Sequence, residues 1–290
     1  MDFGVIPTLP PPTPSCDGLP PAIAAAFEAQ VRRGELSVAL ARGMAGKILE
    51  ETLHEEPDLA RLAEWLESDP GLTTATLNAA NSAFFGLRMK VQTVDRALAQ
   101  LGSVRAREVL LLALSRAAMF TVREFKEEMV ALREHSVATG VWARALAVQT
   151  GLAPATAFAC GLLHEVGRPV ALQELSSLSR LSRVKLSRAT LWQTAASYRD
   201  QVALVLVRGW ADVDLVETIQ GSGRRAVPRT VAFAKRIAAL DFGWGDTCPA
   251  PESPSELAAE ANLGGLLLTE DQASEILSMR QRALSQIKSF

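Results

Sequence analysis

The sequence predicts an all-α protein, and three observations support this prediction. Alanine and other strong helix formers recur along almost the whole chain, and alanine has the highest intrinsic helix propensity. Apolar residues repeat at intervals of three and four, which is the spacing of one face of a helix. Alternating β-branched runs bounded by hairpin turns, the pattern of β-strands, are missing. We therefore expect helices joined by short loops.

Length and composition narrow the classes of function. The chain has 290 residues, of which 48% are hydrophobic and 21% are charged, so it can bury a sizeable core in one large or two small domains. The formal net charge of −2 gives no strong signal for nucleic acid. No apolar run approaches the roughly 18–20 residues of a membrane span, and no secretory signal is visible. Three scattered cysteines fit neither a disulfide framework nor a zinc site. We expect a cytoplasmic protein without membrane insertion.

Residues 1–21 are rich in proline, which removes backbone hydrogen-bond donors and excludes helix. We expect a proline-rich flexible tail here. Such a tail serves either as a plain spacer, the commoner role of this composition, or as a docking segment for a partner. In either role it should contribute little to the stability of the folded body.

Several helices are expected before the charged segment 121–128, which we interpret as the boundary of a first lobe. A first helix covers residues 38–53, and a second begins near Pro57. A third begins at Asp69 followed by Pro70, because Asp caps a helix and Pro suits the first helical position. The lobe therefore consists of short, capped helices.

The most apolar helix of the chain is expected at residues 104–120. Gly86 can end the preceding segment in a left-handed conformation, and Thr93 and Ser103 are candidate caps of two further helices. Around residues 110–114 the second of these helices is apolar on nearly every face. A helix of this kind should be central and buried.

A second lobe is expected over residues 127–240, after the charged segment 121–128. A long helix with an apolar stripe comes first, and a shorter helix over residues 155–165 follows, which Gly167 and Pro169 terminate. The stripe on the long helix consists of Val130, Val137, Val141, Ala145 and Val148.

A glycine- and proline-rich linker is expected at residues 241–254. Residues 253–256 then have the pattern of a capping box, with Pro254 at the first helical position, and residues 269–272 have a second one. Two C-terminal helices follow within residues 255–290, and we expect them to pack on the second lobe.

Two histidines are the strongest candidates for a chemical site. His135 lies in the long helix, and His164 ends the shorter one, next to Glu165. Two antiparallel helices joined by a short loop would bring the histidines together, and a histidine–carboxylate cluster of this kind can bind a transition metal. The alternative is that both are buried histidines satisfied by hydrogen bonds, and that Glu165 only pairs with Arg168 on the adjacent turn.

Two motifs resemble HDOD domains, a bacterial family related to HD-type phosphohydrolases. The first is Asn81-Ser-Ala-Phe-Phe-Gly86, and the second is Gly161-Leu-Leu-His-Glu-Val-Gly167. The resemblance covers about residues 37–240. It implies a two-lobed helical fold in which an N-terminal helical lobe, residues 37–120, precedes an HD-like helical lobe.

The resemblance also implies a degenerate metal site. HD-type enzymes are similar to one another in using a His, an adjacent His-Asp pair and a distant Asp around one or two metals. His135 and His164 match this pattern, but Glu165 replaces the Asp of the pair, and the distant Asp falls at Lys235, with Asp241 as the alternative position. A lysine would place a cation where the metal needs an anion. We therefore expect no catalytic residue, no metal and no cofactor, and a relic pocket formed by His135, His164, Glu165 and Lys235.

The function that this resemblance implies is signal transduction by a non-catalytic regulatory module, a pseudoenzyme that binds other signalling proteins. Two alternatives stay open. One is a divergent metal-dependent phosphohydrolase that acts on a nucleotide, although Arg199 stands where relatives carry a histidine. The other is a sensor that binds a nucleotide ligand in the relic pocket.

One basic segment is a candidate surface for an anionic partner. Leucine and valine recur at every third position of residues 175–184, so the stretch 176–190 predicts a basic amphipathic helix. The alternative is an ordinary solvated charged face. The basic residues are Arg180, Arg183, Lys185 and Arg188.

Overall fold

Helices make up all the regular secondary structure in the part of the chain that the computed structural model describes, which confirms the all-α prediction. The structure describes residues 14–36, 43–54, 56–82, 85–87, 89–207, 213–221, 224–242 and 253–287. In chain order the helices are α1 (Pro21–Arg33), α3 (Met44–Leu53), α4 (Leu59–Glu67), α5 (Pro70–Ala80), α6 (Val94–Leu114), the π-helical turn η1 (Ser115–Met119), the 3-10 turn η2 (Arg123–Phe125), α7 (Lys126–Thr150), α8 (Pro154–Leu163), α9 (Gly167–Leu181), α10 (Arg188–Ser197), α11 (Arg199–Val207), α12 (Val213–Gln220), α13 (Ala226–Phe242), α14 (Pro254–Leu263) and α15 (Glu270–Ile287).

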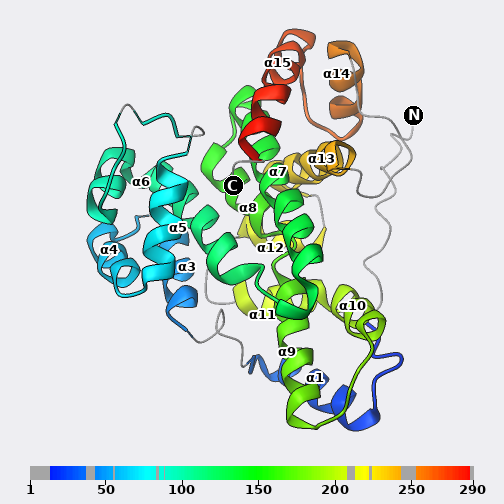
Figure 1. The fold of residues 1–290 in the computed structure, drawn as a ribbon. Coiled ribbons are helices and arrows are strands. Elements are labelled where there is room, and N and C mark those ends of the chain that lie inside the picture. Colours follow the sequence, from blue (N-terminus) through cyan, green and yellow to red (C-terminus); the bar gives the residue numbers. More distant parts are fainter. Residues whose placement is uncertain are drawn as a thin grey trace.

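Helices α3 to α6 form the N-terminal lobe, in which α3, α4 and α5 all contact α6 (Figure 1). Asp69 caps α5 through its side chain, as predicted. Helix α4 begins later than predicted, because Asp58 is its cap: the Asp58 carboxylate accepts a hydrogen bond from the Arg61 backbone N–H at 3.1 Å. Pro57 therefore precedes the helix and does not lie in its first turn.

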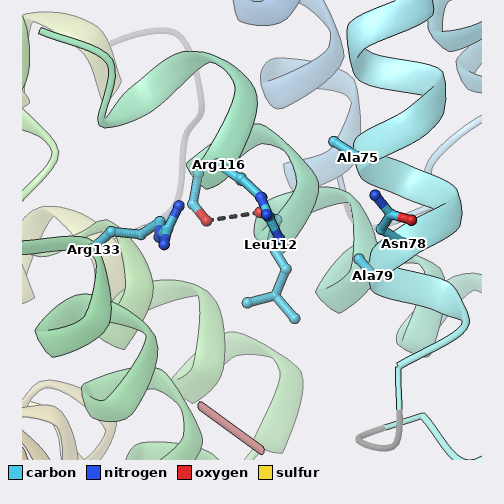
Figure 2. Close-up of a pocket in the computed structure, with 7 residues that line it drawn as sticks. Ala75, Asn78, Ala79, Leu112, Arg116 and Arg133 are labelled. Carbon is cyan, nitrogen blue, oxygen red and sulfur yellow. Dashed lines mark hydrogen bonds between the residues drawn. The ribbon is translucent and has the colours of Figure 1, made fainter. Parts of the chain in front are cut away.

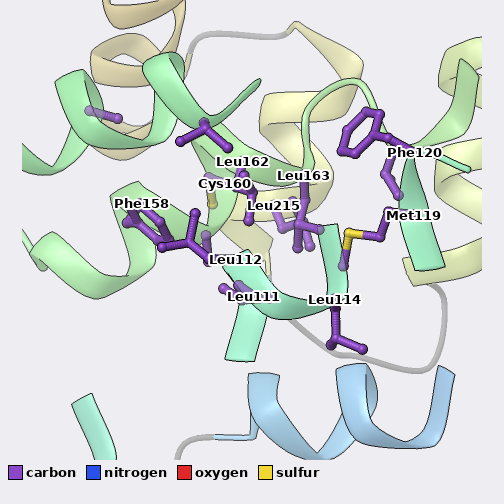
Figure 3. Packing of buried hydrophobic residues seen from close by; sticks show 14 of the residues in the cluster. Leu111, Leu112, Leu114, Met119, Phe120, Phe158, Cys160, Leu162, Leu163 and Leu215 are labelled. Carbon is purple, nitrogen blue, oxygen red and sulfur yellow. The ribbon is translucent and has the colours of Figure 1, made fainter. Parts of the chain in front are cut away.

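Helix α6 supplies the most buried segment of the lobe, which confirms the prediction of a central apolar helix. Residues 110–114 are all buried. Figure 3 shows leucines of this segment packed against side chains of α8 and α12, so α6 connects the two lobes. The helix is kinked at Gly102, where φ is 68° and the second helix was expected to begin. Its regular part ends before residue 115, because residues 115–119 form the π-helical turn.

Helix α7 is the centre of the HD-like lobe and packs against α8, α13 and α15. The predicted apolar stripe is wrong at both ends, since Val130 and Val148 are exposed. In the middle, by contrast, every residue from 135 to 143 is buried. Neighbouring helices surround this part of α7, so burial follows the position along the helix and not one stripe.

The prediction of a flexible tail is wrong for residues 15–21. The backbone N–H of Ser15 donates to Ser197 Oγ at 3.1 Å, the Cys16 thiol lies 3.5 Å from the Tyr198 hydroxyl, and Leu19 is buried. Pro21 is the first residue of α1, the position that proline tolerates best in a helix. Helix α1 then packs on α9 and α11 of the HD-like lobe. Residues 1–13 lie outside the described residues.

Both predicted capping boxes are present in the C-terminal helices. Ser253 and Glu256 bond reciprocally at the start of α14, and Thr269 and Gln272 do so at the start of α15. Helix α15 contacts α14 and α7. Residues 243–252 of the predicted linker lie outside the described residues. Within the described part of the chain, no helix combines the length and the apolar character that crossing a membrane requires.

Candidate functional site

The fold brings together the two histidines that the sequence singled out. His135 lies on α7, and His164 follows the last residue of α8. Their ring centroids are 5.3 Å apart with an interplanar angle of 68°. Both side chains are buried, with relative exposures of 3% and 7%. The site is therefore enclosed between helices and not open to solvent.

Glycines allow the helices around this site to approach closely. A Cβ at Gly161 on α8 would lie 2.7 Å from the Gly140 Cα on α7, and a Cβ at Gly167 would lie 1.8 Å from the carbonyl oxygen of Arg199. Both distances are shorter than atoms tolerate, so only glycine fits. The sequence-based role of Gly167 and Pro169 as helix terminators is wrong. Gly167 begins α9, where it makes room for α11, and Pro169 lies in the first turn.

His164 is held in one orientation by the backbone. Its Nδ1 lies 2.6 Å from the carbonyl oxygen of Gly161. A carbonyl only accepts, so Nδ1 carries the proton and Nε2 presents a lone pair. Burial, reinforced by the charge of Lys235, lowers the pKa of His164 well below its ordinary value. The same two causes lower the pKa of His135 to about 4. Both imidazoles are thus neutral at pH 7.

Glu165 is the centre of a cluster of cations that three different helices supply. Its Oε1 lies 3.3 Å from Lys235 Nζ of α13 and 3.4 Å from the Arg199 guanidinium of α11. Its Oε2 lies 3.4 Å from the Arg168 guanidinium of α9. Burial raises the pKa of Glu165, but Lys235 and the two arginines outweigh this effect and hold the pKa of the carboxyl well below its usual range. The carboxylate is therefore ionised and paired, although it is only 4% exposed.

These residues do not fit a dication. The residues described in the structure contain no group of three or more His, Cys, Asp or Glu side chains that could hold a metal ion. The Glu165 carboxylate, which lies 3.9 Å from His164 Nε2, already neutralises Lys235 and contacts Arg168 and Arg199. A metal ion there would face three cations at short range in a medium of low dielectric. The side chain of Asp241, the alternative ligand, lies outside the described residues.

The neutral histidines predict that stability falls as the pH falls. The pKa of His135 is about 4 in the folded protein and 6.5 for an unperturbed histidine, so below pH 6.5 the unfolded chain binds a proton that the folded protein excludes. The stabilisation is complete above pH 6.5 and is lost as the pH falls towards 4. Between pH 7.5 and pH 5.0 this single group should account for about 2 kcal/mol of the free energy of unfolding.

Urea-induced unfolding of the wild type and of His135→Gln at these two pH values measures the effect. The variant should lose less stability between pH 7.5 and 5.0 than the wild type does. Equal losses would mean that His135 takes up its proton as readily in the folded protein as in the unfolded chain.

The basic segment does not form the predicted amphipathic helix. Arg180 lies in the last turn of α9, Arg183 and Lys185 lie in the connection to α10, and Arg188 begins α10. The helix ends because Arg183 adopts a left-handed φ of 56° and because Ser187 caps the next helix. Among these four cations, two are occupied within the molecule. Arg180 pairs with Glu124 at 3.3 Å, and Arg188 pairs with Glu128 and lies over the Phe125 ring.

The first motif has a structural role around Asn81. Its side-chain amide donates to the carbonyl oxygens of Leu77 and Val91 at 2.8 and 2.9 Å, and its Oδ1 accepts from the Val91 N–H at 2.8 Å. Asn81 thus closes the loop that leads from α5 to α6. Phe85 is buried, and Gly86 has a positive φ of 58°. Residues 83 and 84 of the motif lie outside the described residues.

Comparisons with known proteins agree with this fold. A family model described as the HDOD domain matches residues 39–211, which is more than half of the chain. Comparison with curated protein sequences gave no match.

Solved structures show the same arrangement of helices. A candidate phosphohydrolase from Shewanella amazonensis SB2B is 23% identical with a TM-score of 0.63, and the match covers 91% of this chain and 98% of that one. An HDOD domain protein with unknown function from Geobacter sulfurreducens is 18% identical with a TM-score of 0.62, over 92% and 99% of the two chains. A candidate signal transduction protein from Marinobacter aquaeolei VT8 is 17% identical with a TM-score of 0.53, over 92% and 65%. At these identities the likeness concerns the fold.

Proposed function

The chain belongs to the HDOD domain family, and from this premise we propose that it is a non-catalytic regulatory module that acts in bacterial signal transduction by binding other proteins. The observation that carries the proposal is the contact of Lys235 Nζ with Glu165 Oε1 at 3.3 Å. In HD-type hydrolases the resemblance places a carboxylate at the position of this lysine. A cation of the protein itself at this position supports the proposal that the metal site is lost.

A hydrolytic site must bind a metal ion and leave a coordination position for an activated water. The two imidazoles are buried against each other, and the Glu165 carboxylate beside them is neutralised by Lys235, Arg168 and Arg199. This geometry supports a structural role for the former metal site. A regulatory module needs only a stable fold and an exposed surface. Neither requirement depends on a bound metal.

Metal binding and phosphodiester hydrolysis test the enzymatic half of the proposal. We expect the purified protein to contain much less than one equivalent of zinc, iron or manganese. With added Mn²⁺, hydrolysis of bis(p-nitrophenyl) phosphate and of cyclic dinucleotides should be no faster with the wild type than with the double variant His135→Gln/His164→Gln. A true HD-type hydrolase would differ from that variant by orders of magnitude in rate, because the activated water depends on the metal.

A full equivalent of tightly bound metal that is lost in the double variant, together with turnover by the wild type alone, would overturn the proposal.

The proposed role in binding other proteins is tested in living cells. We expect the double variant to restore the phenotype of a deletion strain when its abundance matches that of the wild type, because the histidines contribute packing and not chemistry. Abundance must be measured, since a destabilised variant is also degraded faster. A partner captured with the tagged protein should then bind it directly when both are purified.

A further inference from the structure

A small groove lies where the two lobes meet, away from the histidine site. Helix α5 forms one wall, and the end of α6, the turn η1 and α7 form the others (Figure 2). The groove has about 340 Å³ of empty space, which includes the part open to solvent. Its lining residues are Ala75, Asn78, Ala79, Leu112, Ser115, Arg116 and Arg133. The floor is thus apolar, and the charged groups at its edge are all cationic.

Two guanidinium groups, from Arg116 and Arg133, share this groove and repel each other. Arg133 is half-buried, and within the described part of the chain it forms no ion pair with a carboxylate. Burial lowers the pKa of Arg133, and Arg116 lowers it further, while Glu134 next to it in the chain acts in the opposite direction. Other half-buried arginines of the protein do have a partner: Arg144, for example, pairs with Glu108 at 2.7 Å. Arg133 therefore carries a half-buried positive charge that an anion would neutralise.

The backbone at the groove contains an irregular turn, η1, and Arg116 belongs to this turn. The N–H of Phe120 bonds to the carbonyl oxygen of Ser115, five residues earlier, which closes the π-helical turn η1. Such turns are rare and occur frequently at functional sites. The hydroxyl of Ser115, which is one of the residues lining the groove, donates to the Leu112 carbonyl oxygen at 2.7 Å. Arg116, the next residue, belongs to this turn and lines the groove.

We propose that this groove binds the phosphate group of a small phosphorylated ligand between Arg116 and Arg133. The planar, five-donor guanidinium group matches phosphate oxygens in geometry, and charge-assisted hydrogen bonds of this kind are among the strongest in proteins. Two guanidinium groups match the two negative charges of a terminal phosphate better than the single charge of a carboxylate.

A ligand at this position would touch both lobes at once. Asn78 and its neighbours belong to the N-terminal lobe, whereas Arg133 belongs to α7 of the HD-like lobe. Occupancy would therefore tie the lobes together by an ionic bridge. This site goes beyond the proposed function and is independent of it, because it uses none of the residues around His135 and His164.

Calorimetric titration of the full-length protein with pyrophosphate, ATP, inorganic phosphate and adenosine, at constant ionic strength, tests the proposal. We expect pyrophosphate and ATP to bind and adenosine not to bind. Arg133→Met, which keeps the apolar stem, should weaken binding by about tenfold or more, as the loss of a charge-assisted hydrogen bond does. Arg96→Met is the matched control: Arg96 is exposed on α6 but does not line the groove, and its loss should leave affinity unchanged.

Unfolding in the absence of ligand separates ligand binding from a structural role. Removal of one of two like charges should leave the urea midpoint of Arg133→Met unchanged or higher, whereas a lower midpoint would mean that the guanidinium supports the fold, against the proposal. Absence of binding by pyrophosphate and ATP up to about 1 mM would overturn it. So would binding that depends on His135 and His164 instead of Arg133, or arginine-dependent binding of a glutamate-rich peptide without any binding of pyrophosphate.

Discussion

Glu165→Gln is expected to lower the free energy of unfolding by about 3–4 kcal/mol. Glu165 is the carboxylate that Lys235, Arg168 and Arg199 share, and it is only 4% exposed. Removal of one member of a buried ion pair leaves the opposite charges uncompensated, which costs roughly 3–5 kcal/mol. We place the effect in the lower part of this range because the side chains of Lys235 and Arg199 are 39% and 25% exposed and can turn to solvent.

Urea-induced unfolding at pH 7.5 measures this loss, and Glu124→Gln is its matched control. Glu124 also pairs with an arginine, Arg180, at 3.3 Å, but both side chains lie at the surface, with exposures of 48% and 67%. Exposed pairs contribute about 0–1 kcal/mol, so the control should be nearly as stable as the wild type. Equal effects of the two substitutions would contradict the central position of Glu165.

A double-mutant cycle isolates the contact that distinguishes this site from a metal centre. Lys235→Met alone should have a small effect, because Arg168 and Arg199 still neutralise Glu165. In the Glu165→Gln background the same change removes one of the unpaired cations, so it should be stabilising. The two effects should therefore not add, which is the signature of direct interaction.

Gly167→Ala is expected to destabilise the protein by about 3 kcal/mol or more. The added methyl group would lie 1.8 Å from the carbonyl oxygen of Arg199 and 2.8 Å from the backbone nitrogen of Ala203. Both atoms belong to the backbone of α11, so no side-chain rotation relieves the overlap, and α9 and α11 must move apart. Overpacking of a tight interface typically costs about 1–3 kcal/mol, and overlap with backbone lies at or beyond the upper end.

Gly102→Ala separates the effect of a close contact from that of backbone strain. Gly102 has a φ of 68°, a conformation that disfavours alanine, but a Cβ there would meet nothing within 4 Å. The expected loss is the backbone strain alone, about 1–3 kcal/mol, because φ of 68° with ψ of 169° lies in a region essentially restricted to glycine. Thermal or urea-induced unfolding measures the loss of stability in both variants, and Gly167→Ala should lose more. If Gly167→Ala proved no less stable than Gly102→Ala, α9 and α11 would not be as close as described.

Local sequence patterns determined the secondary structure and the family. Helix propensity, the Asp69 cap and the capping boxes of α14 and α15 all act within one or two turns, so their residues are near neighbours in the chain. The motif that ends in Gly167 pointed to the HDOD family and to a histidine pair, and the burial of residues 110–114 in α6 followed from their apolar character on nearly every face. Each of these features depends on contacts that a short segment makes by itself or on its overall polarity.

The tertiary structure decided which charges and glycines matter, because those contacts join residues far apart in the chain. Glu165 and Lys235 are seventy positions apart, and only the packing of α13 against α7 and α8 brings them to 3.3 Å. The same packing turns Gly167 from an apparent helix terminator into a point of contact with α11. The local sequence does not predict that Arg116 and Arg133 line one groove. The π-helical turn and α7 form its walls only in the packed molecule. Helix ends are set by neighbours in sequence, whereas the partners of a buried charge are set by the distances between helix axes, and those distances exist only in the packed molecule.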